Sequence, residues 1–193
     1  FFDCLAEYIE PAPTIKELFG DLPFIKPGTS SNKYRCNSLS EYTKKYIRNK
    51  DDILTQYVAR PHNENDLKIY KLVLKAKKKG KNLRYVDIPE ELQTHSNTTS
   101  FLDRYKALDS DSVSHTVVAH IAKDGHYYIH PDIKQNRSIT VREAARIQGF
   151  PDDYYFEYSR TAAFKQIGNA VPPILSRKVA MAVIDFFDER KGE

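Results

Sequence analysis

Asn169 is the side chain of this sequence whose type and position most clearly suggest binding chemistry, because it follows Gly168 and precedes a helix start at Pro172 and Pro173. Glycine permits backbone turns that other residues avoid, and an asparagine amide offers both a donor and an acceptor. The free N–H groups at the start of a helix also attract an anion or a carboxylate. We therefore predict a binding turn at Gly168-Asn169, although a lone pair of this kind is more often the ordinary start of a helix.

A second group of candidate residues lies in the segment RSITVREAARIQGF at 137–150. Arg142 and Arg146 are four residues apart on one helix face, with Glu143 between them. On an exposed face such charges form local ion pairs worth a few tenths of a kcal/mol.

The elements that must position these residues are helices with recognisable ends. Thr140 and Glu143 have the spacing of a capping box, and Gly149 suits the end of the helix predicted over 140–148. A longer helix with a buried apolar stripe is predicted over 174–187. The stripe comprises Leu175, Val179, Ala182, Val183 and Phe186.

Upstream of these segments, the pattern is less regular. Residues 14–23 predict a short amphipathic helix, and 65–79 predict a longer one with Leu67, Tyr70 and Leu74 on its apolar face. We predict no element over 31–63. Alternation over 114–122 and 126–130, around an Asp-Gly pair, predicts a β-hairpin.

The bulk properties exclude several classes of protein. With 30 Lys and Arg against 26 Asp and Glu, the small basic excess is compatible with a polyanionic partner. Cys4 and Cys36 have no metal-ligand spacing and no disulfide framework, and no apolar run could span a bilayer. Because the sequence begins at Phe1 and its single methionine is Met181, we expect a piece of a longer polypeptide.

Together, the segment 137–150 and the segment KQIGNAVPP at 165–173 resemble the last two conserved blocks of the DNA cytosine-5 methyltransferases. These enzymes transfer a methyl group from S-adenosyl-L-methionine (AdoMet) to carbon 5 of cytosine. The resemblance is specific over 114–187 and rests on position alone over 1–113. One departure is Glu157-Tyr158-Ser159, where the family usually has a glycine.

The resemblance implies an α+β fold: a small target-recognition domain, followed by C-terminal helices that complete a Rossmann-like AdoMet-dependent methyltransferase domain. Residues 1–30 would end a catalytic-domain segment and linker, 31–130 would form the target-recognition region, and 131–193 would rejoin the catalytic domain. Asn169 and Val171 would touch AdoMet. The residues with a structural role in the two blocks would be Arg137, Thr140, Arg142, Glu143, Gly168 and Pro172.

The resemblance also points to DNA contacts in the variable region. The basic run 68–84 has no acidic residue and is usually a solvated helix face, but beside this signature Lys77, Lys78 and Lys79 become candidate phosphate contacts. Thr116 lies where the family tends to place a threonine that contacts the target strand. The hydroxyl-rich stretch 94–100 and Arg104 fit DNA contacts and a solvated loop equally well.

The catalytic parts of the family are missing from this sequence. Its nucleophile stands in a Pro-Cys pair and its acid in a Glu-Asn-Val, and neither is present here. We therefore expect the chain to be inactive alone, as a fragment or subunit that shares AdoMet with a catalytic part and uses no metal. The expected setting is the cytoplasm of a prokaryote, or a phage, with double-stranded DNA as partner and no membrane.

Two alternatives stay open. The chain could be a non-catalytic DNA-binding or regulatory module that retains the methyltransferase C-terminal fold. An RNA-binding module is a weaker third interpretation, because the aromatic residues do not form a stacking platform. In isolation the chain should expose the apolar faces of 140–150 and 174–187, so we expect self-association of the fragment.

Overall fold

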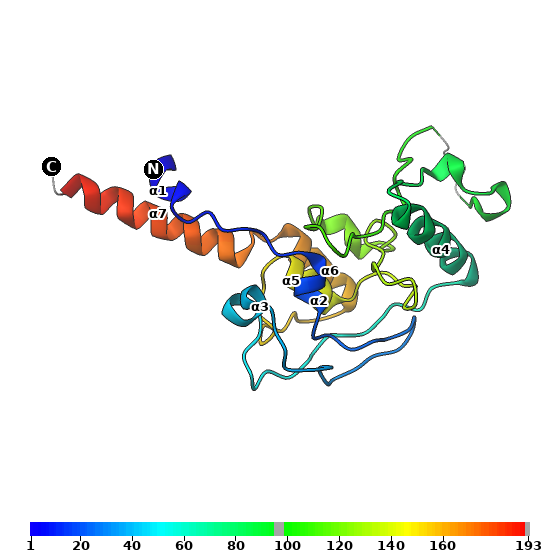
Figure 1. Cartoon of the computed structure of the whole chain (residues 1–193), viewed down its shortest axis with the longest axis horizontal. Helices are drawn as coiled ribbons and strands as arrows, with labels where there is room; N and C mark the ends of the chain where they lie inside the picture. Colours follow the sequence, from blue (N-terminus) through cyan, green and yellow to red (C-terminus); the bar gives the residue numbers. More distant parts are fainter. Residues whose placement is uncertain (95–98, 192–193) are drawn as a thin grey trace.

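The computed structural model describes residues 1–94 and 99–191 of the chain. Short helices and irregular segments form a body, from which one long helix extends, while another helix lies at the opposite end of the long axis (Figure 1). The helical elements of these residues, in chain order, are α1 (Phe2–Ala6), α2 (Ile15–Phe19), α3 (Glu41–Tyr46), α4 (Glu64–Lys78), the 3-10 turns η1 (Tyr85–Asp87), η2 (Glu90–Leu92) and η3 (Ala119–Ala122), α5 (Val141–Ile147), α6 (Arg160–Asn169) and α7 (Pro173–Lys191).

The predicted helix ends are confirmed where a local cap defines them. Thr140 accepts from the backbone N–H of Glu143, whose carboxylate accepts in return from the N–H of Thr140, and Thr14 forms the same capping box at α2. Asn63 caps α4 in a similar way. Gly149 follows α5 with a φ of +76°, the left-handed conformation that glycine adopts at low cost.

The predicted β-hairpin is wrong. Residues 119–122 form the 3-10 turn η3 and pack on α6, and a second turn, from Gly125 to Tyr128, prevents the two arms from pairing. Ile129 instead bridges Ala107 on one side and Ser138 on the other. Among the described residues, pairing of this kind amounts to three isolated bridges, so the structure is mixed and mainly helical.

The main core surrounds α5, which is buried on every side rather than on one face. Its apolar residues pack with η3, α6 and α2, elements from distant parts of the sequence. The expectation that 140–150 exposes an apolar face is therefore wrong, because the body of this chain already covers it. The fully enclosed members of this cluster are Ile15, Tyr128, Ala144, Ala145, Ala163 and Ile167.

A second, smaller core lies under α4. Tyr70 and Leu74 are buried as predicted, together with Ile69 and Val73. Leu67, however, is only half-buried, because the buried stripe is rotated toward Ile69 and Val73. η1 packs on this cluster through Tyr85, and Ile88, which follows η1, is buried in the same cluster.

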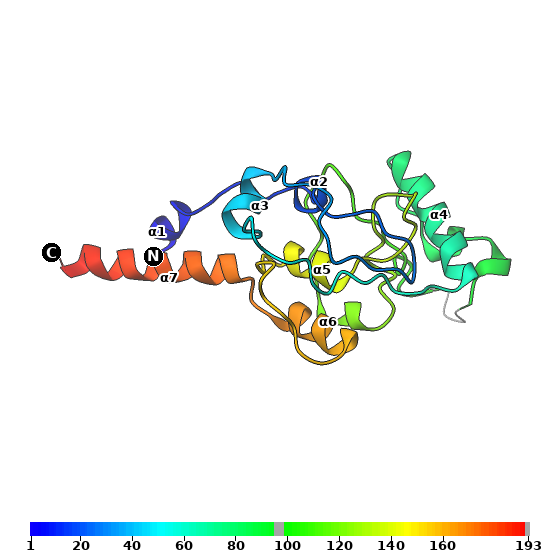
Figure 2. The same ribbon diagram turned by 90° about the horizontal axis from the view of Figure 1, so that it is seen from below.

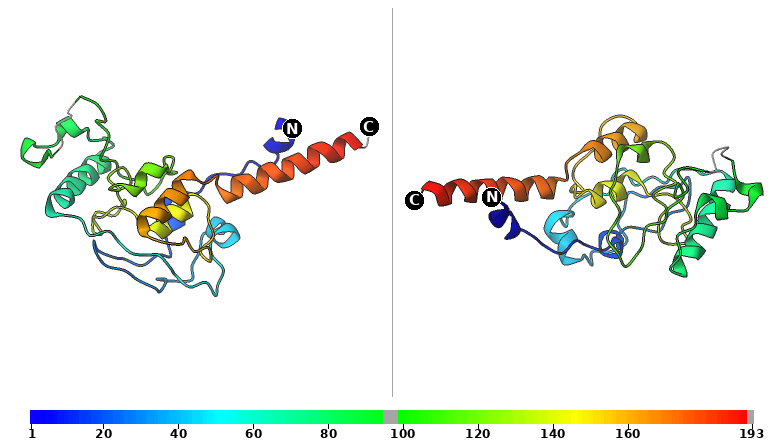
Figure 3. Two further views of the ribbon diagram at one scale, coloured as in Figure 1. Left: turned by 180° about the vertical axis from the view of Figure 1, so that it is seen from behind. Right: turned by 90° about the horizontal axis from the view of Figure 1, so that it is seen from above.

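α7 projects from the body (Figures 2 and 3), and several apolar side chains along it are exposed. Ala182 is buried, whereas Leu175, Ile184 and Phe187 are about half exposed. Within the described chain α1 is the helix that packs on α7, with the Phe1 ring edge-on to a ring of α7. Of the predicted stripe, Leu175 and Val183 are exposed, whereas Ala182 is buried and Val179 and Phe186 are half-buried, so the predicted exposure of 174–187 is confirmed only in part.

Candidate functional site

Three arginines of the segment 137–150 are enclosed completely. The side chains of Arg137, Arg142 and Arg146 have no exposed surface. Arg146 lies between two carboxylates, with one Nη atom 2.6 Å from Asp152 and 3.0 Å from Asp21. The solvated-face alternative for these charges is excluded.

Glu143 is the partner of Arg137. Each of its carboxylate oxygens accepts from a guanidinium N–H of Arg137 at 2.7 Å, and one also accepts from the backbone N–H of Thr140. Burial alone would raise the pKa of this carboxyl, but Arg137, the nearby His130 and the Thr140 N–H lower it to about 2. Glu143 is therefore ionised at neutral pH although it is buried.

Arg142 has a different environment, made mostly of backbone carbonyl groups. Its guanidinium donates to the carbonyls of Thr55, Pro151 and Tyr154 and to the Thr55 hydroxyl at 2.8 Å. It thereby fixes two irregular segments on either side of α5. These contacts suit holding a fold together, and the side chain is too enclosed to reach a ligand.

Gly168 does not form the turn that we predicted. It lies inside α6, one residue before the helix ends at Asn169. A Cβ atom there would lie 2.3 Å from the backbone N of Ala119 and 2.4 Å from the carbonyl carbon of Val118. Glycine is required because η3 crosses α6 at this point, not because of its backbone freedom.

The connector between α6 and α7 is held from beneath by the end of α5. The amide of Gln148 donates to the carbonyl of Ile167 at 3.0 Å and to that of Ala170 at 3.4 Å. Asn169 and Val171 lie on the outer side of this connector, and Val171 is 65% exposed. Both predicted cofactor contacts are therefore accessible and next to each other on a fixed support.

Thr116 lies at the rim of a hollow of about 800 Å³. The Tyr128 hydroxyl donates to the Thr116 carbonyl and accepts from the Val118 N–H, while Val117 between them is buried in the core. The alternation turns the side chains of Thr116 and Val118 outward. The hollow is also lined by Phe101, Asp103, Arg104, His120, Lys123 and Asp124.

Arg104 lines the same hollow from a distant part of the chain. Its guanidinium stacks 4.2 Å over the ring of Tyr85 and donates to the carbonyls of Ser100 and Phe101. The structure thus brings two predicted DNA contacts, Thr116 and Arg104, to one surface. Of the hydroxyl-rich stretch 94–100, residues 95–98 lie outside the described part of the chain.

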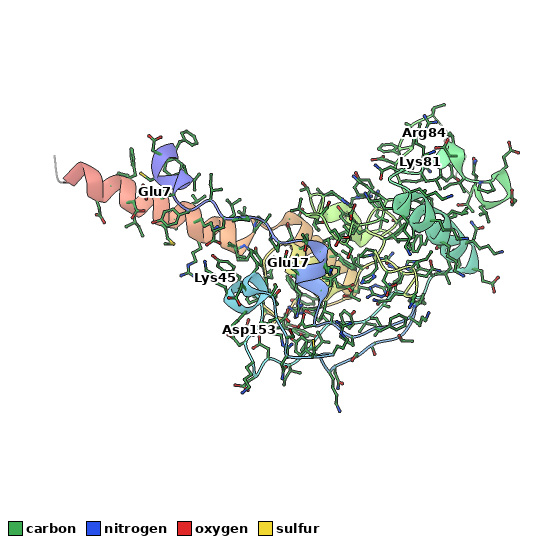
Figure 4. The ribbon with its side chains drawn as sticks, viewed as in Figure 1. Glu7, Glu17, Lys45, Lys81, Arg84 and Asp153 are labelled. Carbon is green, nitrogen blue, oxygen red and sulfur yellow. The ribbon has the colours of Figure 1, made fainter. Side chains whose placement is uncertain are left out.

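The three candidate lysines are at the end of α4. Lys77 pairs with Asp109 at 3.5 Å and lines a second, smaller hollow, which shares Asp103 with the first. Lys78 and Lys79 are exposed. Lys81 continues the basic run at the end of the molecule opposite to Glu7, the residue that follows α1 (Figure 4).

Sequence reasoning missed Phe101, Asp21 and Tyr57. Phe101 lines the hollow with its ring 78% exposed, and its neighbours in the sequence have no pattern that indicates this. Asp21 and Tyr57 are partners of buried arginines that lie more than 70 residues away. Asp152, by contrast, could have been found from the Pro-Asp-Asp turn that follows α5.

Neither a metal centre nor a membrane span is found among residues 1–94 and 99–191. No group of three or more His, Cys, Asp or Glu in this part could hold a metal ion. No helix in it is both long and apolar enough to cross a bilayer.

Comparison with known proteins gives consistent matches. The model of the family described as C-5 cytosine-specific DNA methylase matches residues 9–185. A type II methyltransferase of Bacillus paralicheniformis, M.Bpa9945I, is 46% identical over 181 residues, which are 89% of this chain and 40% of that protein. DNA (cytosine-5)-methyltransferase 2 of Arabidopsis thaliana is 34% identical over 84% of this chain and 12% of its own length.

A solved structure has the same fold. It is described as a DNA modification methyltransferase encoded within a prophage of E. coli, and it matches with a TM-score of 0.57 at 23% identity. The match covers 93% of this chain and 48% of that one. The chain thus spans less than half the length of the proteins that it resembles here.

Proposed function

Because this chain belongs to the family of C-5 cytosine-specific DNA methylases, we propose that it supplies the target-recognition region and the last helices of an enzyme that methylates carbon 5 of cytosine in double-stranded DNA. The observation that carries this proposal is the set of exposed apolar side chains on α7, next to the accessible residues Asn169 and Val171; the set comprises Leu175, Met181, Val183, Ile184 and Phe187. An exposed apolar set of this size normally packs against other protein. The partner would be the Rossmann-like catalytic part, in the same polypeptide or as a separate subunit.

The connector fits one edge of an AdoMet site. Asn169 offers an amide that can both donate and accept, and Val171 beside it offers an exposed apolar surface. When bound, AdoMet supplies the methyl group. In this proposal Asn169 and Val171 orient the cofactor, and the catalytic part provides the remaining walls of its pocket.

The two halves of the proposed function use different elements. α7, at one end of the long axis, would dock on the catalytic part, and the lysines at the end of α4, at the other end, would face DNA (Figure 1). Thr116 and Arg104 would face DNA from the hollow, whose Val118 lies against Gly168 of α6. The division at about residues 30 and 130 that we predicted belongs to this proposal. Because the sequence has no Pro-Cys pair and no Glu-Asn-Val, this chain alone should not transfer a methyl group.

The proposed function is tested in a host that lacks cytosine methylation. This chain is expressed joined to the rest of its methyltransferase and, separately, by itself, and the host DNA is then bisulfite-sequenced. Methylcytosine confined to one short motif with the joined form, and none with the chain alone, is the expected result. Unmodified DNA with abundant soluble joined protein would instead favour a non-catalytic module.

Two variants separate the cofactor role from the DNA role. Asn169→Ala should weaken AdoMet binding by the joined enzyme and leave duplex binding intact, and an unchanged AdoMet affinity removes Asn169 from the site. Replacing Lys77, Lys78 and Lys79 by glutamine should lower DNA affinity and reduce its salt slope by about 0.9 for each phosphate that a lysine no longer neutralises. Lys44→Gln, at an exposed lysine of α3, is the control.

A further inference from the structure

The ring of Phe101 is held outward on a strained backbone. Its φ is +54°, in the left-handed region that a bulky side chain rarely adopts, and its side chain is 78% exposed. Neither property stabilises the fold, because an exposed ring contributes no hydrophobic burial and the backbone conformation is unfavourable. Strain of this kind persists only where the surroundings impose it, and it is concentrated at functional positions.

The surroundings that impose this conformation are visible. Arg104 donates from Nε and Nη2 to the carbonyls of Phe101 and Ser100, each at 3.0 Å, and its guanidinium carbon lies 4.2 Å from the centre of the Tyr85 ring. Tyr85 is 1% exposed, and its N–H donates to the carbonyl of Leu102 at 2.6 Å. The ring of Phe101 is thus presented by a buried support that belongs to the core under α4.

The chemistry of the adjoining hollow matches nucleobases better than phosphates. Lys123 offers a donor, but Asp103 and Asp124 also line the hollow and would repel a phosphate. Carboxylates accept instead from the amino groups of bases, and Thr116 can contact a base edge. An exposed aromatic ring beside such groups suits contact with the face of a base.

We propose that Phe101 is a base-stacking residue, whose ring inserts at one base step of the recognised DNA sequence. This proposal rests on the proposed function and deepens it, because it names a residue that determines specificity. Apolar side chains used in this way unstack neighbouring base pairs and bend the duplex. The insertion would hold the neighbouring base edges in front of Thr116 and Arg104.

The test uses the joined enzyme and duplexes that contain its motif, with 2-aminopurine placed in turn at each position. This base fluoresces more strongly when it is unstacked. The wild type should raise the fluorescence at one step in addition to the step of the target cytosine, which such an enzyme flips out of the stack. Phe101→Ala should abolish only the additional rise. The preference for the motif over a scrambled duplex should fall about tenfold, in line with the effect of removing one stacking side chain. Phe101→Tyr should retain both properties.

Phe101→Gly separates stacking from a structural role. Glycine relieves the unfavourable φ, so this variant should unfold at a higher temperature than the wild type while it loses the additional fluorescence rise. Tyr155→Ala, which removes an exposed aromatic ring elsewhere, should change neither property. A full additional fluorescence rise in Phe101→Ala, or no additional rise with a wild type that binds and methylates its motif, overturns the stacking role alone. A wild type that neither binds nor methylates any duplex overturns the proposed function as well.

Discussion

Replacing Glu143 by glutamine should lower the free energy of unfolding of this chain by about 3–5 kcal/mol at pH 7, the cost of removing one partner of a buried ion pair. Arg137 keeps its charge in the variant, and its side chain, like that of Glu143, has no exposed surface. Water therefore cannot replace the missing carboxylate. The amide that takes its place can accept only one of the two guanidinium hydrogen bonds.

The pKa of Glu143 gives a second, independent value for the stability that the ionised carboxylate contributes. Its ordinary value is 4.5, and in the folded chain it is lowered to about 2. Each unit of pKa is worth about 1.4 kcal/mol, so the ionised form is favoured in the folded state by about 3 kcal/mol. Because the folded pKa is the lower one, this stability is fully present above pH 4.5 and is lost as the pH falls through about 2.

The measurement is urea unfolding of the wild type and of Glu143→Gln, from pH 7 down to pH 3. The difference between them should be constant down to about pH 5 and then shrink by about 2 kcal/mol by pH 3, as the wild-type carboxyl begins to lose its advantage. Burial lowers the pKa of His130 to about 4 and Glu143 opposes this shift, so the comparison is repeated with His130→Asn in both proteins. Glu157→Gln, at an exposed carboxylate, is the control. A difference below about 1 kcal/mol at pH 7, or one that stays constant down to pH 3, refutes the reasoning.

Two further substitutions test the backbone contacts. Gly168→Ala should lower the melting temperature more than Gly80→Ala does, because the added Cβ at Gly168 would meet the backbone of η3. Gly80 has open space around it, and only its φ of +71° opposes alanine. Equal shifts of the melting temperature in calorimetry would contradict the close packing at Gly168. Tyr158→Gly should stabilise the chain by about 0.5–1 kcal/mol in urea unfolding, because Tyr158 has a φ of +72° and is 89% exposed; a loss of stability would show that the ring packs against another group.

The features that could be predicted from the sequence are those that a few neighbouring residues determine. The capping boxes at Thr14 and Thr140, the cap at Asn63 and the stop at Gly149 each depend on contacts within four residues. Such contacts form in any setting that leaves the segment helical. The helices α4 and α5 therefore have the expected bounds to within one or two residues, whereas α2 begins as expected but ends at Phe19, four residues early.

The prediction of a hairpin at 114–130 was wrong because the local turn signal competed with packing against residues that are distant in the sequence. Residues 118 and 119 fit against Gly168, and Ile121 is buried in the core around α5. Nothing in the sequence near Asp124 indicates these partners. Burial of apolar side chains against α6 outweighs the backbone pairing that an Asp-Gly turn favours.

The candidate site could also be predicted only in part, because it too depends on contacts between residues distant in the sequence. The residue types at Thr116 and Arg104 could be selected from the sequence, but not their meeting at one hollow, because that depends on the non-local contacts of Arg104 with Tyr85 and of Thr116 with Tyr128. The burial of the arginines near α5 was one of two open alternatives. It could not be decided without Asp21, which lies 125 residues before Arg146.

The two sequence blocks that suggested the family are one physical unit in this structure. α5 has charged residues enclosed on its sides, and moving the helix would separate Arg146 from Asp21 and Asp152. Such a network adds little net stability compared with apolar residues, but it penalises every other arrangement of the same groups, since each leaves a charge buried without its partner.

The end of this immobile helix holds the connector through Gln148, and Gly149 packs on Ile174 in the first turn of α7. Through these contacts, the fixed position of 137–150 also fixes the segment that presents Asn169 and Val171. A ligand that binds there meets a preorganised edge and does not have to order it, which reduces the cost of binding.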